Sequence, residues 1–392
     1  MNGTALSLIQ LGAVFFGLGF LGRLAGRIGM SPVPLYLLGG LAFGHGGFIN
    51  FAGIEDFAHI ASEIGVILLL LMLGLEYTAK ELVTGLKQSW MAGAVDLVLN
   101  MLPGVAVALL LGWGPVGALV MAGVTYSSSS GIIAKVLGDL GRLGNRETPV
   151  VLSILVIEDL AMAAYLPILT AVLAGVSFVG GLTALGISLA VITLVLVGAL
   201  RYGHLMSNVL DSPDRESFLL KLLGAALLVA GLASALQVSA AVGAFLLGIA
   251  ISGGTAENAT RVLEPLRDLF AAMFFVLFGL NTDPRTIPPV LGIALLLALV
   301  TTITKMATGW WAAGRQGIGV PGRARAGAAL IARGEFSIVI AGLAVASGVV
   351  PIELAALATT YVLIMAVSGP VAARYVEPVV ALFQGKKPEP VF

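Results

Sequence analysis

The sequence predicts an all-α polytopic membrane protein, and two observations support this prediction. Hydrophobic residues make up 58% of the 392 positions and charged residues only 11%, whereas about a quarter of a soluble domain is charged. Apolar stretches close to the length that spans a bilayer, about 20 residues, recur along the whole chain. The chain has no Cys and no net charge, so disulfides and thiolate metal sites are excluded and no basic patch indicates nucleic acid.

The apolar stretches predict thirteen transmembrane helices joined by short connections. The second and ninth are short or are interrupted by Gly or Pro. Because the connections and the tail are brief, we expect residues 1–392 to form a single transmembrane domain with no soluble domain. The predicted spans are 4–22, 32–49, 57–76, 88–111, 115–137, 149–173, 178–200, 216–235, 238–252, 265–281, 287–312, 324–347 and 353–373.

The basic residues predict the orientation in the membrane. With thirteen spans, one set of connections holds 18 of the 21 Lys and Arg residues and the other set holds only Arg285. The remaining two, Lys305 and Arg333, lie inside spans. Positive charge marks the cytoplasmic side, so we expect the N-terminus outside and the C-terminus in the cytoplasm. No basic region precedes the first apolar stretch, which is therefore not typical of a signal peptide.

Thirteen spans divide into six, one and six. We expect residues 1–173 and 216–375 to form two repeats of opposite orientation, joined by a linker helix at 178–200. The units begin near Thr4 and Glu216, and their fifth helices carry polar interruptions near Thr125 and Ala332. Inverted repeats of this kind are typical of secondary transporters. The alternative is that these offsets match by chance.

Two adjacent acids, Glu158 and Asp159, lie in the otherwise apolar stretch VVLSILVIEDLAMAAYLPILTAVL. A charged side chain at the bilayer centre costs about 2.5–3.5 kcal/mol on insertion scales, so the pair needs a function or a partner. Neighbours on a helix point about 100° apart, so both cannot face one ion. We assign Asp159 to the ion and Glu158 to the side of the site. The alternative is a buried ion pair that only fixes helix packing.

A serine-rich segment, VTYSSSSGII, interrupts the fifth predicted span. Consecutive serines followed by Gly weaken the helix, and their hydroxyls can satisfy backbone groups that an unwound segment frees. The alternative is that small residues here only permit close helix packing. The candidate ligands in this segment are Thr125, Ser127, Ser128 and Ser129.

A second interruption, LIARGEFSIVI, lies in the twelfth span and contains Arg333, Gly334 and Glu335. Gly334 permits a break in the helix. Two broken helices at corresponding repeat positions indicate a binding site near the membrane midplane. The half-helix ends there would offer opposed partial charges.

Three segments, IEDLAMAAYLPIL, TYSSSSGIIAKVLGDLG and LIARGEFSIVIAGLA, resemble those of the cation:proton antiporter-2 family. That family includes Kef-type potassium efflux proteins and Nap-type sodium/proton antiporters. The resemblance implies a homodimer, a core with two crossed broken helices, and elevator-like alternating access. It also implies that Asp159 is the ion-binding aspartate and that Lys305 is the lysine that pairs with the acid site.

By the same resemblance, Thr125 and the serines match the first unwound segment, and Arg333 and Glu335 match the second crossed helix. The chain has Glu-Asp where the family has Asp-Asp or Gln-Asp, which leaves ion choice and stoichiometry open. Hard alkali cations prefer oxygen ligands, so we expect Asp159 to hold potassium or sodium in competition with a proton. We expect Glu158 to lie beside Lys305, and no other cofactor is implied.

Asp96 is a further acid inside a span. Adding the repeat offset of roughly 207–212 residues to the position of Asp96 gives a position near Lys305. Asp96 and Lys305 are therefore candidate symmetry mates or partners. An acid at an interface is the alternative. With every group ionised, the acids within the spans exceed the bases by two, which suits a cation. The acids are Asp96, Glu158, Asp159 and Glu335, and the bases are Lys305 and Arg333. We expect a structural role for Arg333 and Glu335.

These observations predict a plasma-membrane antiporter that exchanges potassium, or alternatively sodium, for protons. A ligand-gated potassium efflux channel is a second class, although no TVGYG-like filter is present. A sodium-coupled solute symporter is a third. No nucleophile–base constellation indicates an enzyme. The expected partners are membrane lipid, a second copy of the chain and a separate cytoplasmic regulatory subunit, because many family members carry a regulatory domain after the last helix.

Overall fold

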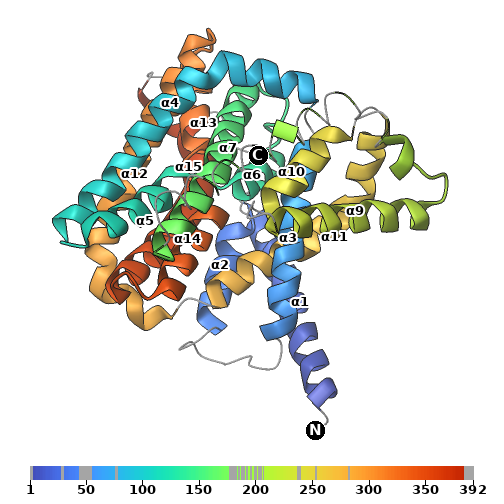
Figure 1. Cartoon of the computed structure of the whole chain (residues 1–392), viewed down its shortest axis with the longest axis horizontal. Helices are drawn as coiled ribbons and strands as arrows, with labels where there is room; N and C mark the ends of the chain where they lie inside the picture. The colour runs from blue at the N-terminus through green and yellow to red at the C-terminus, as the bar shows by residue number, and fades with distance from the viewer. Residues whose placement is uncertain are drawn as a thin grey trace.

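The computed structural model describes residues 3–27, 31–43, 55–75, 78–175, 207–235, 240–251, 254–280 and 283–383, with isolated positions between 183 and 205. All regular structure within these residues is helical (Figure 1). The helices are α1 Gly3–Arg27, α2 Val33–Phe43, α3 Glu55–Leu75, α4 Ala79–Leu110, α5 Gly114–Tyr126, α6 Ser130–Asp139, α7 Thr148–Leu173, α9 Arg215–Ala235, α10 Ala240–Ala250, α11 Gly254–Leu280, the short η1 Pro284–Thr286, α12 Ile287–Arg315, α13 Val320–Ala329, α14 Glu335–Ser347 and α15 Ile352–Phe383.

Each predicted span outside 178–200 coincides with one helix or with two consecutive helices. The predicted linker helix at 178–200 falls almost wholly outside the described residues. Seven helical stretches within the described residues are long and apolar enough to cross a membrane, and Val33–Phe43 and Ile60–Met72 are shorter apolar helices. The chain is therefore an all-helical, multi-pass membrane protein, whereas the number thirteen remains a prediction.

Three helices extend furthest beyond the predicted spans. Helix α4 begins at Ala79, α11 begins at Gly254 and α15 continues to Phe383, each about two or three helical turns beyond the predicted boundary. Hydropathy marks the part of a helix that lies in lipid, and a helix continues beyond it because its backbone hydrogen bonds do not require an apolar sequence.

The helices form two groups (Figure 1). Helices α4, α5, α7, α12, α13, α14 and α15 lie together on one side of the view, and α1, α3, α9, α10 and α11 lie on the other. One large apolar cluster extends through the first group and continues into α2, α3, α10 and α11, and two smaller clusters lie among α1, α3, α9, α10 and α11. The two groups are therefore joined by a shared apolar core.

Glycines allow α2 and α11, and likewise α3 and α10, to pack backbone against backbone. A Cβ on Gly40 of α2 would lie 2.1 Å from a carbonyl oxygen of α11, and one on Gly279 of α11 would lie 2.2 Å from a carbonyl oxygen of α2. Gly74 of α3 and Gly248 of α10 make the same kind of reciprocal contact, at 2.2 and 2.3 Å. No side chain fits at these positions, which is typical of closely packed transmembrane helices.

Candidate functional site

Both predicted interruptions are breaks between consecutive helices. Helix α5 ends at Tyr126 and α6 begins at Ser130, and the cap residues Ser127 and Ser129 are extended, with ψ of 131° and 103°. Helix α13 ends at Ala329, and α14 begins at Glu335. The sequence explains the first break, since serine hydroxyls compete with helical backbone hydrogen bonds.

The two breaks contact each other directly. The backbone N–H of Ser129 donates to the carbonyl oxygen of Ala332 at 2.9 Å, and the hydroxyl of Ser337 donates to Val124 at 2.8 Å. Gly334 lies against the first break, because a Cβ on it would lie 2.5 Å from Oγ of Ser129. Glycine is therefore required at this crossing for space.

The two acids of α7 face different partners. The hydroxyl of Ser130, the first residue of α6, lies 3.2 and 3.1 Å from Oδ1 and Oδ2 of Asp159. Glu158 accepts hydrogen bonds from the backbone N–H and the hydroxyl of Ser128, and its Oε1 lies 2.8 Å from Nζ of Lys305. Adjacent side chains diverge by about 100° on a helix, and here the two carboxylates have separate surroundings.

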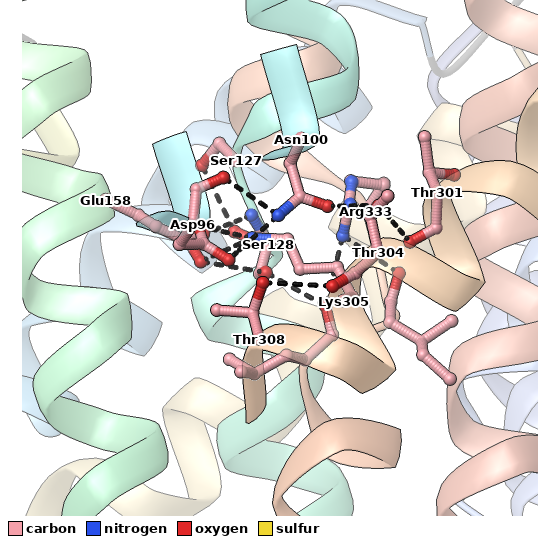
Figure 2. A network of polar contacts seen from close by, with 12 residues as sticks. Asp96, Asn100, Ser127, Ser128, Glu158, Thr301, Thr304, Lys305, Thr308 and Arg333 are labelled. Carbon is pink, nitrogen blue, oxygen red and sulfur yellow. Dashed lines mark hydrogen bonds and ion pairs between the residues drawn. The ribbon is translucent and has the colours of Figure 1, made fainter. Parts of the chain in front are cut away.

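Lys305 of α12 lies at the centre of a buried polar network (Figure 2). Its Nζ lies 2.8 and 2.7 Å from the two carboxylate oxygens of Asp96 on α4, and it also contacts Glu158 on α7. Asn100, one turn after Asp96, donates to Oδ1 of Asp96 at 2.9 Å and accepts from Thr304 at 2.7 Å. The network therefore ties α4, α7 and α12 together.

Arg333 binds backbone carbonyls at both breaks. Its Nε lies 3.1 Å from the carbonyl oxygen of Thr125, and its Nη1 lies 3.0 Å from those of Leu330 and Ile331. These carbonyls are at the ends of α5 and α13, where the helical acceptors lack intrahelical partners. The contacts of this buried guanidinium therefore connect the ends of α5 and α13. The side chain of Glu335 lies outside the described part of the chain.

The remaining hydroxyls of the first break have local partners. Oγ1 of Thr125 lies 2.8 Å from a backbone carbonyl oxygen of α4. Oγ of Ser127 lies 3.3 Å from the carbonyl oxygen of Ser128. Oγ of Ser129 accepts from the N–H of Ile132 at 3.2 Å and caps α6. These contacts shape the break, and its extended backbone presents oxygens outside the helical pattern.

Three residues near the acids were not among the predicted site residues: Ser130, Asn100 and Thr304. The local sequence does not indicate that Ser130 is the first residue of α6. Four consecutive serines give no sign of the residue at which the helix resumes. Asn100 had a signal, since it follows Asp96 by four residues and therefore shares its helix face. Thr304 had no such signal, because it directly precedes Lys305 and adjacent residues do not share a helix face.

The electrostatic balance of the site is negative. Asp96, Glu158, Lys305 and Arg333 are 0% exposed and Asp159 is 2% exposed. When all are ionised, these described side chains carry one negative charge in excess. Buried charges need partners of opposite sign, and the excess charge suits a cation without a large hydration shell.

Residues 11–377 match the protein family described as "Sodium/hydrogen exchanger, transmembrane". The chain is 31% identical over 383 residues to the K(+)/H(+) antiporter subunit KhtU of Bacillus subtilis (strain 168), covering 95% of this chain and 92% of that protein. It is 31% identical over 385 residues to the Ammonium/H(+) antiporter subunit AmhT of Alkalihalophilus pseudofirmus, covering 95% and 93%.

The fold resembles that of the sodium proton antiporter MjNhaP1 from Methanocaldococcus jannaschii, solved at pH 8. The TM-score is 0.72 with 15% sequence identity, and the match covers 97% of this chain and 98% of that one. At this identity the likeness shows the fold alone, which is an antiporter fold.

Proposed function

The chain belongs to the sodium/hydrogen exchanger family, and we propose that it is a secondary antiporter that exchanges a monovalent cation for protons. Potassium is the preferred cation in this proposal, because the relative named as a K(+)/H(+) antiporter subunit matches 95% of the chain at 31% identity. Ammonium is an alternative, because the relative named as an Ammonium/H(+) antiporter subunit matches equally well. Sodium is a further alternative, supported by the match of residues 11–377 to the sodium/hydrogen exchanger family. On this proposal the protein is a transporter and not an enzyme.

The observation that carries the proposal is the position of Asp159, buried where the two broken helices cross and in contact with Ser130. A hydroxyl can donate to a carboxylate and can also offer a lone pair to a cation. The carboxylate therefore binds either a proton or a metal ion. Backbone oxygens of the 127–129 segment would supply further hard ligands. This competition for one carboxyl group is the basis of exchange.

Glu158 has a different role in this proposal. It is held by Ser128 and Lys305, so it acts as a fixed charge beside the ion and not as the exchanging group. Arg333 contributes by keeping the two breaks in contact. Thr125, Ser127 and Ser129 shape the first break through their hydroxyl contacts, and in this proposal their hydroxyls do not bind the ion.

We propose elevator-type alternating access for the movement of the ion. Asp159 is 2% exposed, so an ion reaches it only after a conformational change, which favours a carrier over an open channel. Two apolar clusters lie outside the group that carries the site, which supports a movement of that group against a second packed group of helices. Closure and shear of rigid groups is a common form of such transitions.

The thirteen-span, inverted-repeat topology is part of the proposal and is supported by the glycine contacts. Gly248 lies 208 residues after Gly40, and Gly279 lies 205 residues after Gly74. Gly40 contacts Gly279 and Gly74 contacts Gly248, which is the reciprocal pattern that a two-fold axis generates. The basic connections support an external N-terminus and a cytoplasmic C-terminus, and residence in the plasma membrane is a further part of the proposal.

We also propose that the protein acts as a homodimer with a cytoplasmic regulatory subunit. Two relatives that match over 90% of their own length are themselves named as antiporter subunits. Native purification of the complex, followed by mass measurement, tests both proposals. The expected result is a complex larger than two copies of this chain.

Purified protein in liposomes with a trapped pH-sensitive dye tests the exchange itself. An imposed proton gradient should dissipate when potassium is added outside, and less or not at all when sodium is added. Protein-free liposomes give the background for each ion. Equal responses to both ions would overturn the potassium preference, and background responses to both would overturn antiport of either ion.

A further inference from the structure

An ion pair away from the acid site connects α6 to the second group of helices. Nζ of Lys135 on α6 lies 3.7 Å from Oδ1 of Asp268 on α11. Helix α6 is the second half of the first broken helix, and its first residue, Ser130, contacts Asp159. The same helix packs against α13 and α15 of the first group and against α3 of the second. The pair therefore spans the boundary between the helices that carry the ion site and the second group.

Each member of this pair also has a partner on its own helix. Nζ of Lys135 lies 3.1 Å from Oδ1 of Asp139, one turn later on α6. Nε and Nη2 of Arg267 lie 3.2 and 2.9 Å from Oδ1 of Asp268. The side chains of Lys135 and Asp268 are 26% and 49% exposed, so water reaches both charges. The pair can therefore open without leaving a buried charge unpaired, which is what makes the breaking of a buried pair costly.

The pair depends on the relative position of the two groups more strictly than the apolar contacts do. The hydrophobic effect is non-directional, so apolar side chains can exchange one set of contacts for another when helices slide. An ion pair requires its charged atoms to lie within about 4 Å. A slide by one to two helical turns, about 5–11 Å, separates them beyond that distance. The pair is therefore made in the conformation of this structure and lost in a displaced one.

We propose that Lys135 and Asp268 form a latch, which holds the group carrying the ion site in the position seen here and opens in each transport cycle. The proposal rests on the proposed exchange and on the proposed movement between the helical groups. It assigns a function to two charges that the ion site does not use. Because Asp139 and Arg267 receive the released charges, the latch opens and closes reversibly.

The first test measures the conformation directly. The chain has no Cys, so spin labels attach only at introduced cysteines. We place them at Lys87→Cys on α4 and Glu216→Cys on α9, both exposed, and measure the distances between them by pulsed electron paramagnetic resonance in liposomes. We expect two distance populations, one of which matches this structure. Asp268→Asn and Lys135→Gln should each lower the ratio of the matching to the displaced population by about two- to fivefold, the range expected for a partly exposed ion pair.

The double variant decides whether the two residues act together. Lys135→Gln combined with Asp268→Asn should lower the ratio no further than either substitution alone, because each already breaks the same pair. Glu257→Gln, at an exposed position on α11, is the control and should leave the ratio unchanged. A ratio that both single substitutions leave at the wild-type value overturns the latch, as does a double variant whose effect is the product of the two single effects.

The second test locks the latch in the liposome exchange assay. Lys135→Cys and Asp268→Cys are joined by a bifunctional thiol reagent that a reductant cleaves. We expect exchange to fall to the level of protein-free liposomes and to return after reduction. Lys135→Cys with Asp139→Cys links two positions within α6 and should exchange equally before and after linking. Linked Lys135→Cys/Asp268→Cys protein that exchanges at its unlinked rate overturns the latch. A wild type that exchanges no cation overturns the proposed function, and the distance measurements then still test the latch by themselves.

Discussion

Asp96 and Lys305 are 209 residues apart in the chain, and their side chains form a fully buried ion pair with a shortest distance of 2.7 Å. Substituting Lys305→Met leaves Asp96 and Glu158 without their shared countercharge. Breaking a buried pair from one side typically destabilises a protein by about 3–5 kcal/mol. We therefore expect a clearly lower melting temperature for the detergent-solubilised variant than for wild type.

The control for Lys305→Met is Lys87→Met, which removes an exposed lysine from α4 and should leave the melting temperature nearly unchanged. Adding Asp96→Asn to Lys305→Met should restore part of the lost stability, because one of the two stranded charges is then removed. Equal melting temperatures for Lys305→Met and Lys87→Met would contradict the importance of the pair.

Asp159→Asn should abolish exchange without unfolding the protein. The amide has the shape of the carboxylate, and its oxygen still accepts the hydrogen bond from Ser130. The amide carries no charge and takes up no proton, so neither the cation nor the exchanged proton binds. The dye response should fall to that of protein-free liposomes, while Asp139→Asn on the partly exposed end of α6 should remain active. Exchange by Asp159→Asn at the wild-type rate would refute the assignment.

The broken helices could be predicted because their causes are local. Consecutive serines compete with the helical backbone, and Gly334 tolerates a break. The structure adds why Gly334 is needed: the crossing leaves no room for a Cβ beside Ser129. That reason depends on a contact between segments about 200 residues apart, and local sequence patterns do not encode it.

The partners of the buried charges were only partly predictable. The repeat offset linked Asp96 to Lys305 as mates or partners, and the structure shows that they are partners. The structure places Arg333 against the backbone carbonyl of Thr125, and the structural role expected for it stays a prediction. The choice of Ser130 beside Asp159 depends on where α6 begins, and this register is set by the packing of the two breaks against each other.

Gly334→Ala tests the crossing of the breaks. The added methyl group would lie 2.5 Å from Oγ and 2.8 Å from Cβ of Ser129. Overpacking of this kind typically costs about 1–3 kcal/mol, so we expect a lower melting temperature and slower exchange. Gly342→Ala on α14, the helix that begins directly after Gly334, meets nothing within 4 Å and gains helix propensity of up to about 1 kcal/mol. Equal effects of the two substitutions would contradict a close crossing.

A cluster of charges away from the ion site joins three segments at one end of the helices. Arg325 of α13 forms ion pairs with Glu147, just before α7, and with Glu377 of α15 at 2.9 Å. Arg142 lies 3.5 Å from the same carboxylate of Glu377. The cluster connects the segment after α6 and the start of α13, and we infer that it holds the two half-helices in register.

This cluster predicts a dependence of stability on pH. Burial raises the pKa of Glu147, but the hydrogen bonds and charge of Arg325 outweigh it and leave the pKa below its ordinary value of 4.5. A carboxyl group with a lowered folded-state pKa stabilises the fold above the unfolded-state pKa and loses that contribution as the pH falls through the folded-state value.

We expect Glu147→Gln to melt at a lower temperature than wild type at neutral pH, with the difference shrinking below a pH of about 4.5. Glu216→Gln, at an exposed position on α9, is the control and should show no such trend. A difference for Glu147→Gln that stays constant down to about pH 3.5 would show that the ion pair with Arg325 does not stabilise the fold.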